Sequence, residues 1–260
     1  MKKTGVGPKV IVIVLMIYLF APFLITGLYS VASNWSNTVF PEAYTADYYY
    51  QMFTSARFWM AIGRSVLVSV VGVMLAEVIM IPLVFAVAAF SPKLENVLKI
   101  VTLMPYAIPG VISAAALLQA YGGSDLPMVV VLSCAYFVLI MPLVYSGLTN
   151  AMHAIDIVPI TEAARVLGAS TWQTFLKIIV PAIAPGILVS TLLSFSTLFG
   201  EFVIANMLIG GSYETVQIYL YLIMKQTGHL SSAVVVIYVI IMTIICGALM
   251  KLTGEKKNAA

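Results

Sequence analysis

Six continuous apolar stretches divide the chain, and runs such as VIVIVLMIYLFAPFLI leave no room for a solvated surface. A helix that crosses a bilayer needs roughly 20 apolar residues. The stretches that meet this length lie at approximately residues 10–30, 65–90, 100–120, 127–148, 186–209 and 231–250. Peptide groups in lipid find no water, and these runs lack the alternating polarity of a barrel strand, so they predict transmembrane helices.

The composition agrees with this pattern. The 260-residue chain is 62% hydrophobic and 9% charged, whereas a soluble domain averages about 25% charged residues. Cys134 and Cys246 fall inside predicted spans, where isolated cysteines usually behave as small apolar residues. We therefore expect an all-α integral membrane protein with six transmembrane helices, organised as a single membrane domain over residues 1–260 and surrounded by membrane lipid.

The basic residues predict the orientation of the chain. Six spans place both termini on one side, which collects ten of the 13 basic residues, and the other side holds Arg57, Arg64 and Lys225. By the positive-inside rule, both termini are expected in the cytoplasm. The net charge of +3 follows from this topology and indicates no nucleic-acid partner. Lys2 and Lys3 precede the first run as in a signal peptide, but the run exceeds the roughly 7–15 residues of a signal core, which favours an uncleaved span.

Two loops stand out between the spans. The first external loop, residues 31–63, is rich in Trp, Tyr and Phe, which favours an interfacial helix over about residues 46–59 and leaves open a docking surface for an external partner. His153 and His229 are expected as solvated loop residues. In the third span, Pro105, Pro109 and Gly110 predict a kink.

The longest cytoplasmic segment, residues 149–185, is semi-polar. Gly168 suits the left-handed end of a first helix. Ser170 and Gln173 have the capping-box spacing for a second helix over about residues 171–180. Pro181 and Pro185 should then bend the chain into the fifth span. The sequence predicts a helix, a glycine elbow and a second helix at the cytoplasmic surface.

This helix pair has two interpretations. It is either an amphipathic element that rests on lipid headgroups or a docking knob for a cytoplasmic protein. A helix resting on lipid would need bulkier anchors than this first helix offers. Ala163 and Ala164 would instead permit a close approach to a partner groove.

The segment EAARVLGASTWQTFLKIIVP resembles the signature loop of bacterial binding-protein-dependent ABC transporter permeases. In that family, Glu-Ala-Ala is followed after three residues by Gly and after nine more by Ile-x-Leu-Pro. Val180 replaces the family's Leu, a conservative change. The matching positions are Glu162, Ala163, Ala164, Gly168, Ile178 and Pro181. The resemblance implies the fold of a type I ABC importer permease, in which Glu162, Ala163, Ala164 and Gly168 would couple to a groove of an ATPase subunit.

The resemblance also implies the partners of such a permease. They are an ABC ATPase dimer that binds ATP and Mg, an extracytoplasmic substrate-binding protein, and a second permease subunit, for which a homologous heterodimer partner is favoured over an identical copy. The expected location is the bacterial cytoplasmic (inner) membrane. The chain has no GxxxxGK[ST] phosphate loop, so ATP must be hydrolysed on another polypeptide. We expect a non-catalytic subunit that binds no cofactor or metal itself.

Two glutamates interrupt the apolar spans. Glu77 is expected near the bilayer centre and Glu201 towards the outer leaflet, and Asn206 extends a polar patch around Glu201. Ionisable groups at such depth generally face a bundle interior or a water-filled path. Each glutamate is a candidate for the translocation pathway or for a structural role, protonated or hydrogen-bonded to a neighbouring helix.

The same glutamates favour a cationic solute such as the polyamines spermidine and putrescine. The resemblance is to permeases for polyamines, ferric iron and phosphonates, so iron and phosphonate stay open. Two alternative functions are a membrane-embedded enzyme and a secondary transporter. A membrane-embedded enzyme would need a Ser/His, paired-Asp or His-rich constellation, and no predicted span contains histidine or aspartate. A secondary transporter commonly shows internal repeats, and none is evident.

Overall fold

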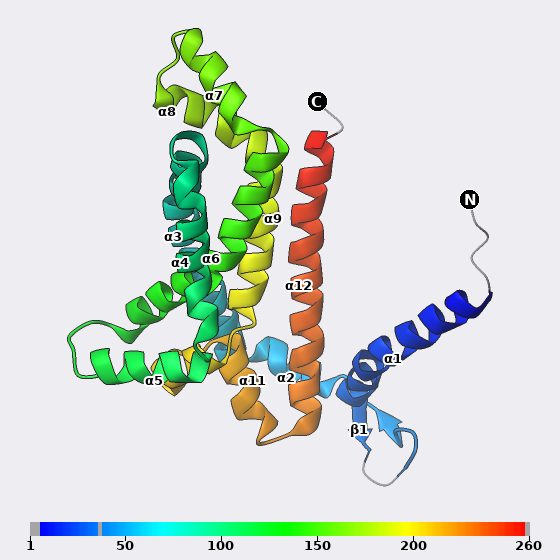
Figure 1. Ribbon diagram of the computed structural model, residues 1–260. Helices are drawn as coiled ribbons and strands as arrows, with labels where there is room; N and C mark the ends of the chain where they lie inside the picture. The colour runs from blue at the N-terminus through cyan, green and yellow to red at the C-terminus, as the bar shows by residue number, and fades with distance from the viewer. Residues whose placement is uncertain (1–5, 36–37, 258–260) are drawn as a thin grey trace. The chain divides into compact units, whose positions relative to one another are not determined.

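The computed structural model describes residues 6–35 and 38–257, and these residues fold almost entirely into helices (Figure 1). Lys2 and Lys3, which contribute to the orientation argument, lie outside the described residues. The chain divides into two compact units: one contains the residues up to Trp59 together with Tyr219–Ile244, and the other contains Met60–Ile218 and the residues from Ile245 onward. The single membrane domain expected from the sequence stays a prediction.

The first unit holds the N-terminal span, a small hairpin and parts of two later helices. Its hairpin pairs Ala32 with Tyr44 in antiparallel register, a minor β element that the all-helical prediction lacked. Its elements are α1 (Val6–Val31), β1 (Ala32–Asn34), β2 (Ala43–Tyr44), α2 (Asp47–Thr54), the start of α3 (Ala56–Phe90), most of α11 (Val216–Met224) and most of α12 (Gly228–Lys257).

His229 does not lie in a solvated loop, because it belongs to the first turn of α12. Its ring stacks between those of Tyr29 and Tyr48, with centroid distances of 4.1 and 5.4 Å. Its Nδ1 lies 2.9 Å from the carbonyl oxygen of Tyr29. These contacts join α1, α2 and α12 within the first unit.

The second unit holds the remaining spans and the signature segment. Its elements are the rest of α3, η1 (Pro92–Leu94), α4 (Glu95–Leu103), η2 (Met104–Ala107), α5 (Gly110–Tyr121), α6 (Met128–Ala154), α7 (Ile157–Val166), α8 (Thr171–Thr174), the π-helical turn η3 (Phe175–Ile179), α9 (Val180–Phe199), α10 (Val203–Leu208), η4 (Gly210–Tyr213), the start of α11 and the end of α12.

The expected membrane architecture is present. Among the described residues, five helices are long and apolar enough to cross a membrane, and a bent pair brings the number to six if it is one span. The five are Lys9–Val31, Ala56–Phe90, Met128–Ala154, Thr171–Phe199 and Gly228–Gly247, and the bent pair joins Pro92–Ala107 to Gly110–Tyr121. The prediction of a helical membrane protein is confirmed, and the predicted count of six spans is met if the bent pair crosses as one span.

The third span is sharply broken. The predicted kink is present, but the two halves meet at 88°, so α5 does not continue the direction of α4. Ile108 adopts an extended backbone with ψ 121°, which is the conformation that a following proline imposes. Pro109 then starts α5 without needing a backbone donor. The range 100–120 therefore contains two helices rather than one straight span.

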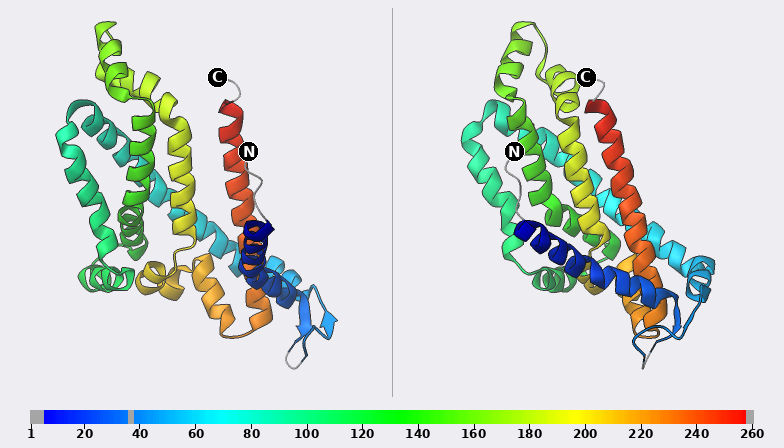
Figure 2. Two further views of the ribbon diagram at one scale, coloured as in Figure 1. Left: turned by 45° about the vertical axis from the view of Figure 1, so that its right-hand side comes forward. Right: turned by 90° about the vertical axis from the view of Figure 1, so that its right-hand side faces the viewer.

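The helices α6 and α9 pack closely along their length, as both views of Figure 2 show. Small residues make this contact. A Cβ on Gly147 of α6 would lie 2.7 Å from the Cβ of Ser190 on α9, and a Cβ on Gly186 of α9 would overlap the side chain of Ala151 on α6. Small residues four apart on each helix let membrane helices approach closely. The pair forms the framework that carries the signature segment.

The start of α9 differs from the prediction. Instead of a separate second helix followed by a bend at Pro181 and Pro185, residues 171–199 form one continuous candidate span. Phe175–Ile179 is a π-helical turn, in which the Val180 N–H donates to the oxygen of Phe175. This wider turn precedes Pro181, which has no N–H to donate. The signature segment therefore leads directly into the fifth span.

Candidate functional site

The signature knob, residues 157–174, comprises α7, the elbow at Gly168 and α8. Within the second unit it lies beyond the ends of α6 and α9 (Figure 1). Asp156 has φ 49° and turns the chain from α6 into α7, and Gly168 has φ 83°. The predicted left-handed elbow is confirmed by this φ. Glycine suits the position because a residue with a side chain would be strained there.

The capping box is also confirmed. The Gln173 N–H donates to Ser170 Oγ at 3.2 Å, and the Ser170 N–H donates to Gln173 Oε1 at 3.0 Å. These two bonds satisfy donors at the start of α8 that have no partner inside the helix. The start of α8, directly after the elbow, is thus fixed by local hydrogen bonds.

The helix α7 has an inner and an outer face. Ile157, Thr161 and Ala164 form the inner face, and Ala164 is only 5% exposed. The side chain of Ala164 therefore packs within the chain. Glu162 and Ala163 are exposed, so two of the predicted coupling positions face outward together with the elbow glycine.

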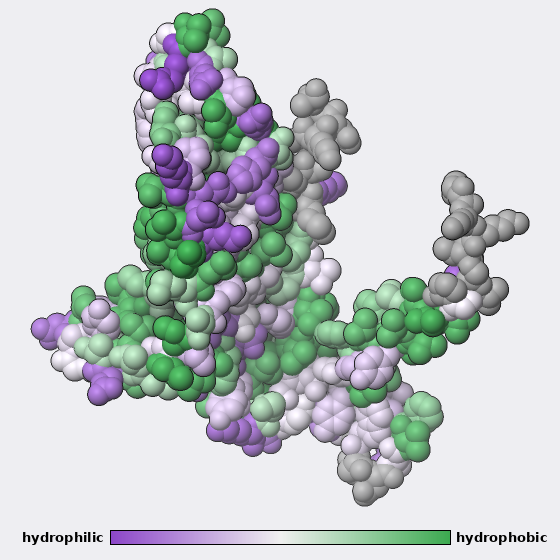
Figure 3. Space-filling view, viewed as in Figure 1, coloured by the Kyte–Doolittle hydropathy of each residue, from purple (hydrophilic) through white to green (hydrophobic). Residues whose placement is uncertain are grey.

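The most exposed apolar side chains of the knob are Val166 and Leu167, at 86% and 87%. They stand directly before the elbow, at the outer end of α7. Figure 3 shows apolar side chains at this end of the second unit with hydrophilic residues next to them. Neither residue was predicted as a contact from the sequence, although the signal was an apolar pair directly before the elbow glycine.

Glu201 lies in a break between α9 and α10. Its Oε1 accepts the Ile204 N–H at 2.7 Å, and its Oε2 accepts the Ala205 N–H at 3.0 Å. The hydroxyl of Tyr136, from α6, donates to the same Oε2 at 3.2 Å. The expected fifth span over 186–209 is thus two helices, and Glu201 makes hydrogen bonds within the chain.

Glu77 and Asn206 are placed differently. Glu77 of α3 accepts a hydrogen bond from the hydroxyl of Thr191 on α9. Thr191 precedes Glu201 by ten positions, which is roughly 15 Å along a helix, so the two glutamates do not share one site. Asn206 belongs to α10, where its N–H donates to the Phe202 oxygen at 2.8 Å. Glu201 therefore belongs to the break, Asn206 to the helix that follows it, and Glu77 to the contact between α3 and α9.

A groove of about 790 Å³ lies beside this break. It is formed by the bend before α5, by α5 and by α6, with Ile204 as the contribution of α10. Its lining carries no charged side chain and consists of Pro105, Tyr106, Ile108, Pro109, Gly110, Ser113, Ala116, Leu117, Tyr121, Leu126, Val130, Val131, Cys134, Ala135, Val138, Leu139 and Ile204. None of the three pathway residues predicted from the sequence lines it.

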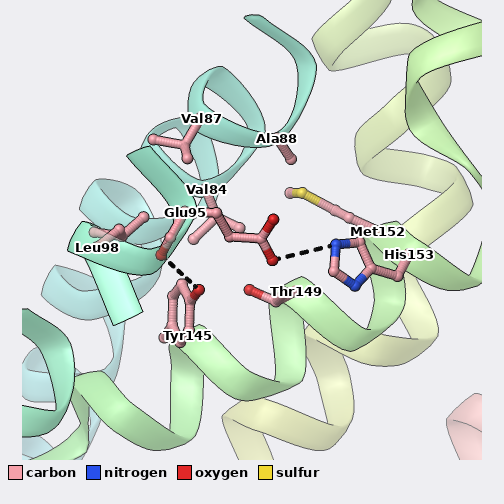
Figure 4. A pocket seen from close by; sticks show the side chains of 9 residues that line it. All are labelled: Val84, Val87, Ala88, Glu95, Leu98, Tyr145, Thr149, Met152 and His153. Atoms are coloured by element: carbon pink, nitrogen blue, oxygen red, sulfur yellow. Dashed lines mark hydrogen bonds and ion pairs between the residues drawn. The ribbon is translucent and has the colours of Figure 1, made fainter. Parts of the chain in front are cut away.

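A smaller cleft lies between α3, α4 and α6 (Figure 4). There, His153 Nε2 lies 3.4 Å from Glu95 Oε1, and the Tyr145 hydroxyl donates to the Glu95 backbone oxygen at 3.4 Å. His153 is in the last turn of α6 rather than in a loop, although its side chain is largely exposed. Within the described ranges, no cluster of three His, Cys, Asp or Glu side chains has the arrangement of a metal site.

Several known transport permeases are similar to this chain in sequence. PhnV of Salmonella typhimurium, named for a 2-aminoethylphosphonate transport system, is 22% identical over 90% of this chain and 88% of its own length. The molybdenum transport permease ModB of Azotobacter vinelandii is 31% identical over 61% of this chain and 64% of its own length. The spermidine/putrescine permease PotB of Escherichia coli is 36% identical over 33% of this chain and 30% of its own length.

A solved structure matches the fold. A chain from a bacterial ABC transporter that imports the acidic polysaccharide alginate superposes with a TM-score of 0.74 at 17% identity, covering 95% of each chain. Residues 78–256 match the family described as the binding-protein-dependent transport system inner membrane component. This match includes the signature knob, the α6–α9 pair and both sides of the break at Glu201. The chain therefore belongs to the family of inner-membrane components of binding-protein-dependent transport systems, the permeases of ABC importers.

Proposed function

We propose that the chain is a non-catalytic permease subunit that binds a separate ATPase through the signature knob and forms half of the translocation pathway for a small solute. The observation that carries the proposal is the exposed apolar pair at the end of α7. Val166 and Leu167 are almost fully exposed, although each would gain about 1.5–3 kcal/mol from burial. A partner groove that covers them explains their position.

The packing of α7 supports a protein partner over a lipid surface. A helix that rests on headgroups buries a continuous apolar face in the membrane boundary. Here the inner residues Ile157, Thr161 and Ala164 already pack inside the chain. The most exposed apolar side chains, Val166 and Leu167, lie together at one end of α7, and the knob lies beyond the ends of α6 and α9 (Figure 1). An end-on contact suits insertion into a groove.

The neighbouring residues add specificity to this contact. Glu162 and Ala163 are exposed on α7, and Gly168 holds the elbow that presents the apolar pair. We assign Glu162, Ala163 and Gly168 to the contact with the ATPase. Ala164 supports the knob from inside.

The coupling route follows the chain. The knob continues without interruption from α8 through the π-helical turn into α9, and Asp156 connects it to α6. A displacement of the knob would therefore move the closely packed α6–α9 pair. In this proposal ATP and Mg bind to the ATPase dimer, the knob and both termini are cytoplasmic, and a binding protein delivers the solute from the other side. A second permease subunit, homologous rather than identical, completes the pathway.

The solute is proposed only as a class. The relatives carry the names of three different solutes, so they support small-solute import without selecting one. The polyamine expectation relied on Glu77 and Glu201, and both carboxylates are engaged within the chain. The uncharged groove and its two tyrosines, Tyr106 and Tyr121, are compatible with an amine through cation–π contacts. Uptake of radiolabelled spermidine, 2-aminoethylphosphonate and molybdate by cells that express the full transporter would identify the class.

The docking proposal is tested by copurification of the chain with the ATPase expressed beside it. Leu167→Ser should lower the affinity for the ATPase by about tenfold or more, since one buried apolar side chain is lost from the contact. Val39→Ser is the matched control, because Val39 is also strongly exposed, at 83%, and lies in the first loop. Equal ATPase binding by both variants would contradict the proposal.

A further inference from the structure

The short helix α10 begins after a break that exposes its backbone. α9 ends at Phe199, and α10 starts at Val203. The first N–H groups of any helix have no partner inside it, and inside a membrane bundle such donors are costly to leave unpaired. Glu201 supplies the acceptors for Ile204 and Ala205. Its carboxylate therefore fixes where α10 starts.

Glu201 is tied to a second helix as well. Tyr136 is 1% exposed and belongs to α6, and its hydroxyl donates to Glu201. An ionised carboxylate has about four acceptor positions. Three are occupied by donors of the chain itself, from Tyr136, Ile204 and Ala205. This leaves little capacity for a solute and makes Glu201 the link between α6 and α10.

The helix α10 in turn packs on α5. A Cβ on Gly110, at the start of α5, would lie 3.9 Å from Ile204 Cγ1. Ile204 also lines the groove, and Ala205 is fully buried. In Figure 1, α5 runs across the end of the second unit that lies opposite the signature knob. Together α5 and α10 form a crosswise layer, called here the α5–α10 layer.

We propose that Glu201 is a positioning residue that holds the α5–α10 layer across the extracytoplasmic end of the groove, so that the layer acts as a gate. The inference rests on the proposed function for its orientation, since a cytoplasmic knob places the layer on the outside. Glu201 acts through α10 and does not contact the solute. Weakening its hydrogen bonds widens the opening of the groove on that side.

Cys134 provides a built-in probe of this gate. It is exposed and lines the groove. In a Cys246→Ser background it would be the single thiol of the chain. Cells that express the full transporter are treated from outside with a membrane-impermeant maleimide, and the labelling rate of Cys134 is measured.

Glu201→Gln replaces one acceptor oxygen by an NH₂ group that faces donors of the chain. The labelling rate should rise about tenfold, the change in open population that the loss of one hydrogen bond to a charged group produces. Tyr136→Phe removes one of the three donors and should give a smaller rise. The matched controls are Glu95→Gln and Tyr145→Phe, which alter the cleft at the other end of α6 and should leave labelling unchanged.

Two results would overturn the inference. One is an unchanged labelling rate in Glu201→Gln and Tyr136→Phe while both variants still copurify with the ATPase. The other is a raised KM for uptake with unchanged labelling, because that result assigns Glu201 to the solute. Failure of the wild-type chain to bind any ATPase would instead contradict the proposed function, and the two failures are thereby distinguished.

Discussion

A Cβ atom on Gly147 would lie 2.7 Å from the Cβ of Ser190, so the close approach of α6 and α9 requires that Gly147 has no side chain. Apolar burial drives helix association weakly in lipid, and close packing of small residues is the main alternative. The α6–α9 pair therefore depends on the absence of atoms at particular positions. In the proposed function this pair transmits movement of the signature knob.

Gly147→Ala is expected to destabilise the α6–α9 pair by about 1–3 kcal/mol, the usual cost of forcing extra atoms into a packed contact. The thermal stability of the purified chain in detergent measures the effect. Gly63→Ala is the control, because a Cβ at Gly63 meets nothing within 4 Å. That variant should be unchanged or slightly more stable, since alanine is the better helix former. Equal stability of the two variants would show that α6 and α9 do not depend on this approach.

The elbow of the knob gives a second prediction. Gly168 has φ 83°, a conformation that costs most L-residues about 1–2 kcal/mol and that asparagine tolerates better. Gly168→Val should weaken ATPase copurification, and Gly168→Asn should retain most of it. No atom lies within 4 Å of a Cβ at this position, so a steric clash cannot explain a difference between the valine and asparagine variants. A similar loss in both variants would point to a direct contact by the glycine instead of its backbone shape.

The exposed acidic residue of α7 gives a third prediction. Glu162→Lys should reduce ATPase binding and ATP-driven uptake, because the reversed charge meets the partner surface, while the spans stay folded. Glu42→Lys in the first loop is the matched charge reversal at an exposed position, and it should leave ATPase binding intact. Copurification at increasing salt concentrations distinguishes an electrostatic effect of the substitution from a steric one, since surface electrostatic effects weaken with ionic strength. Normal ATPase stimulation by the Glu162 variant would remove Glu162 from the contact.

Features encoded locally were predictable from the sequence. The elbow at Gly168 and the capping box of Ser170 and Gln173 follow from backbone preferences and hydrogen bonds over three residues, and all are present. The apolar runs likewise predicted the five long candidate spans and the bent pair that is the sixth if it crosses as one. Pro109 predicted a kink through its missing N–H, but the angle of 88° accompanies the packing of α5 on α10, which no local signal encodes.

Features that join distant segments were not predictable. Glu201 was a candidate for the pathway because of its depth, but Tyr136, its partner, lies 65 positions earlier. The break after Phe199 also frees backbone N–H groups that donate to the carboxylate. In the continuous span predicted over 186–209, those N–H groups would be bonded within the helix. Ala164 was expected to face a partner, but the left-handed turn at Asp156 sets the direction of α7, and Ala164 packs inward.

The contact between Glu77 and Thr191 gives the last prediction. Thr191→Val keeps the shape of the side chain and removes the hydroxyl that donates to Glu77. Hydrogen bonds between membrane helices average about 0.6 kcal/mol and reach about 1.7, so the variant should be destabilised within that range, and Thr191→Ser should restore stability. Thr197→Val on the same helix is the control, because the Thr197 hydroxyl donates only to the Leu193 oxygen of its own helix.

Uptake assays decide what Glu77 does beyond this contact. If Glu77 is structural, Thr191→Val and Glu77→Gln lower stability, and the KM for the solute stays unchanged in the folded protein. A raised KM in Glu77→Gln with normal stability would assign the carboxylate to the translocation pathway, because a group that binds solute changes affinity without being needed for packing. Glu77 lies on α3 and contacts α9, so a structural role would make it a support of the framework that carries the knob.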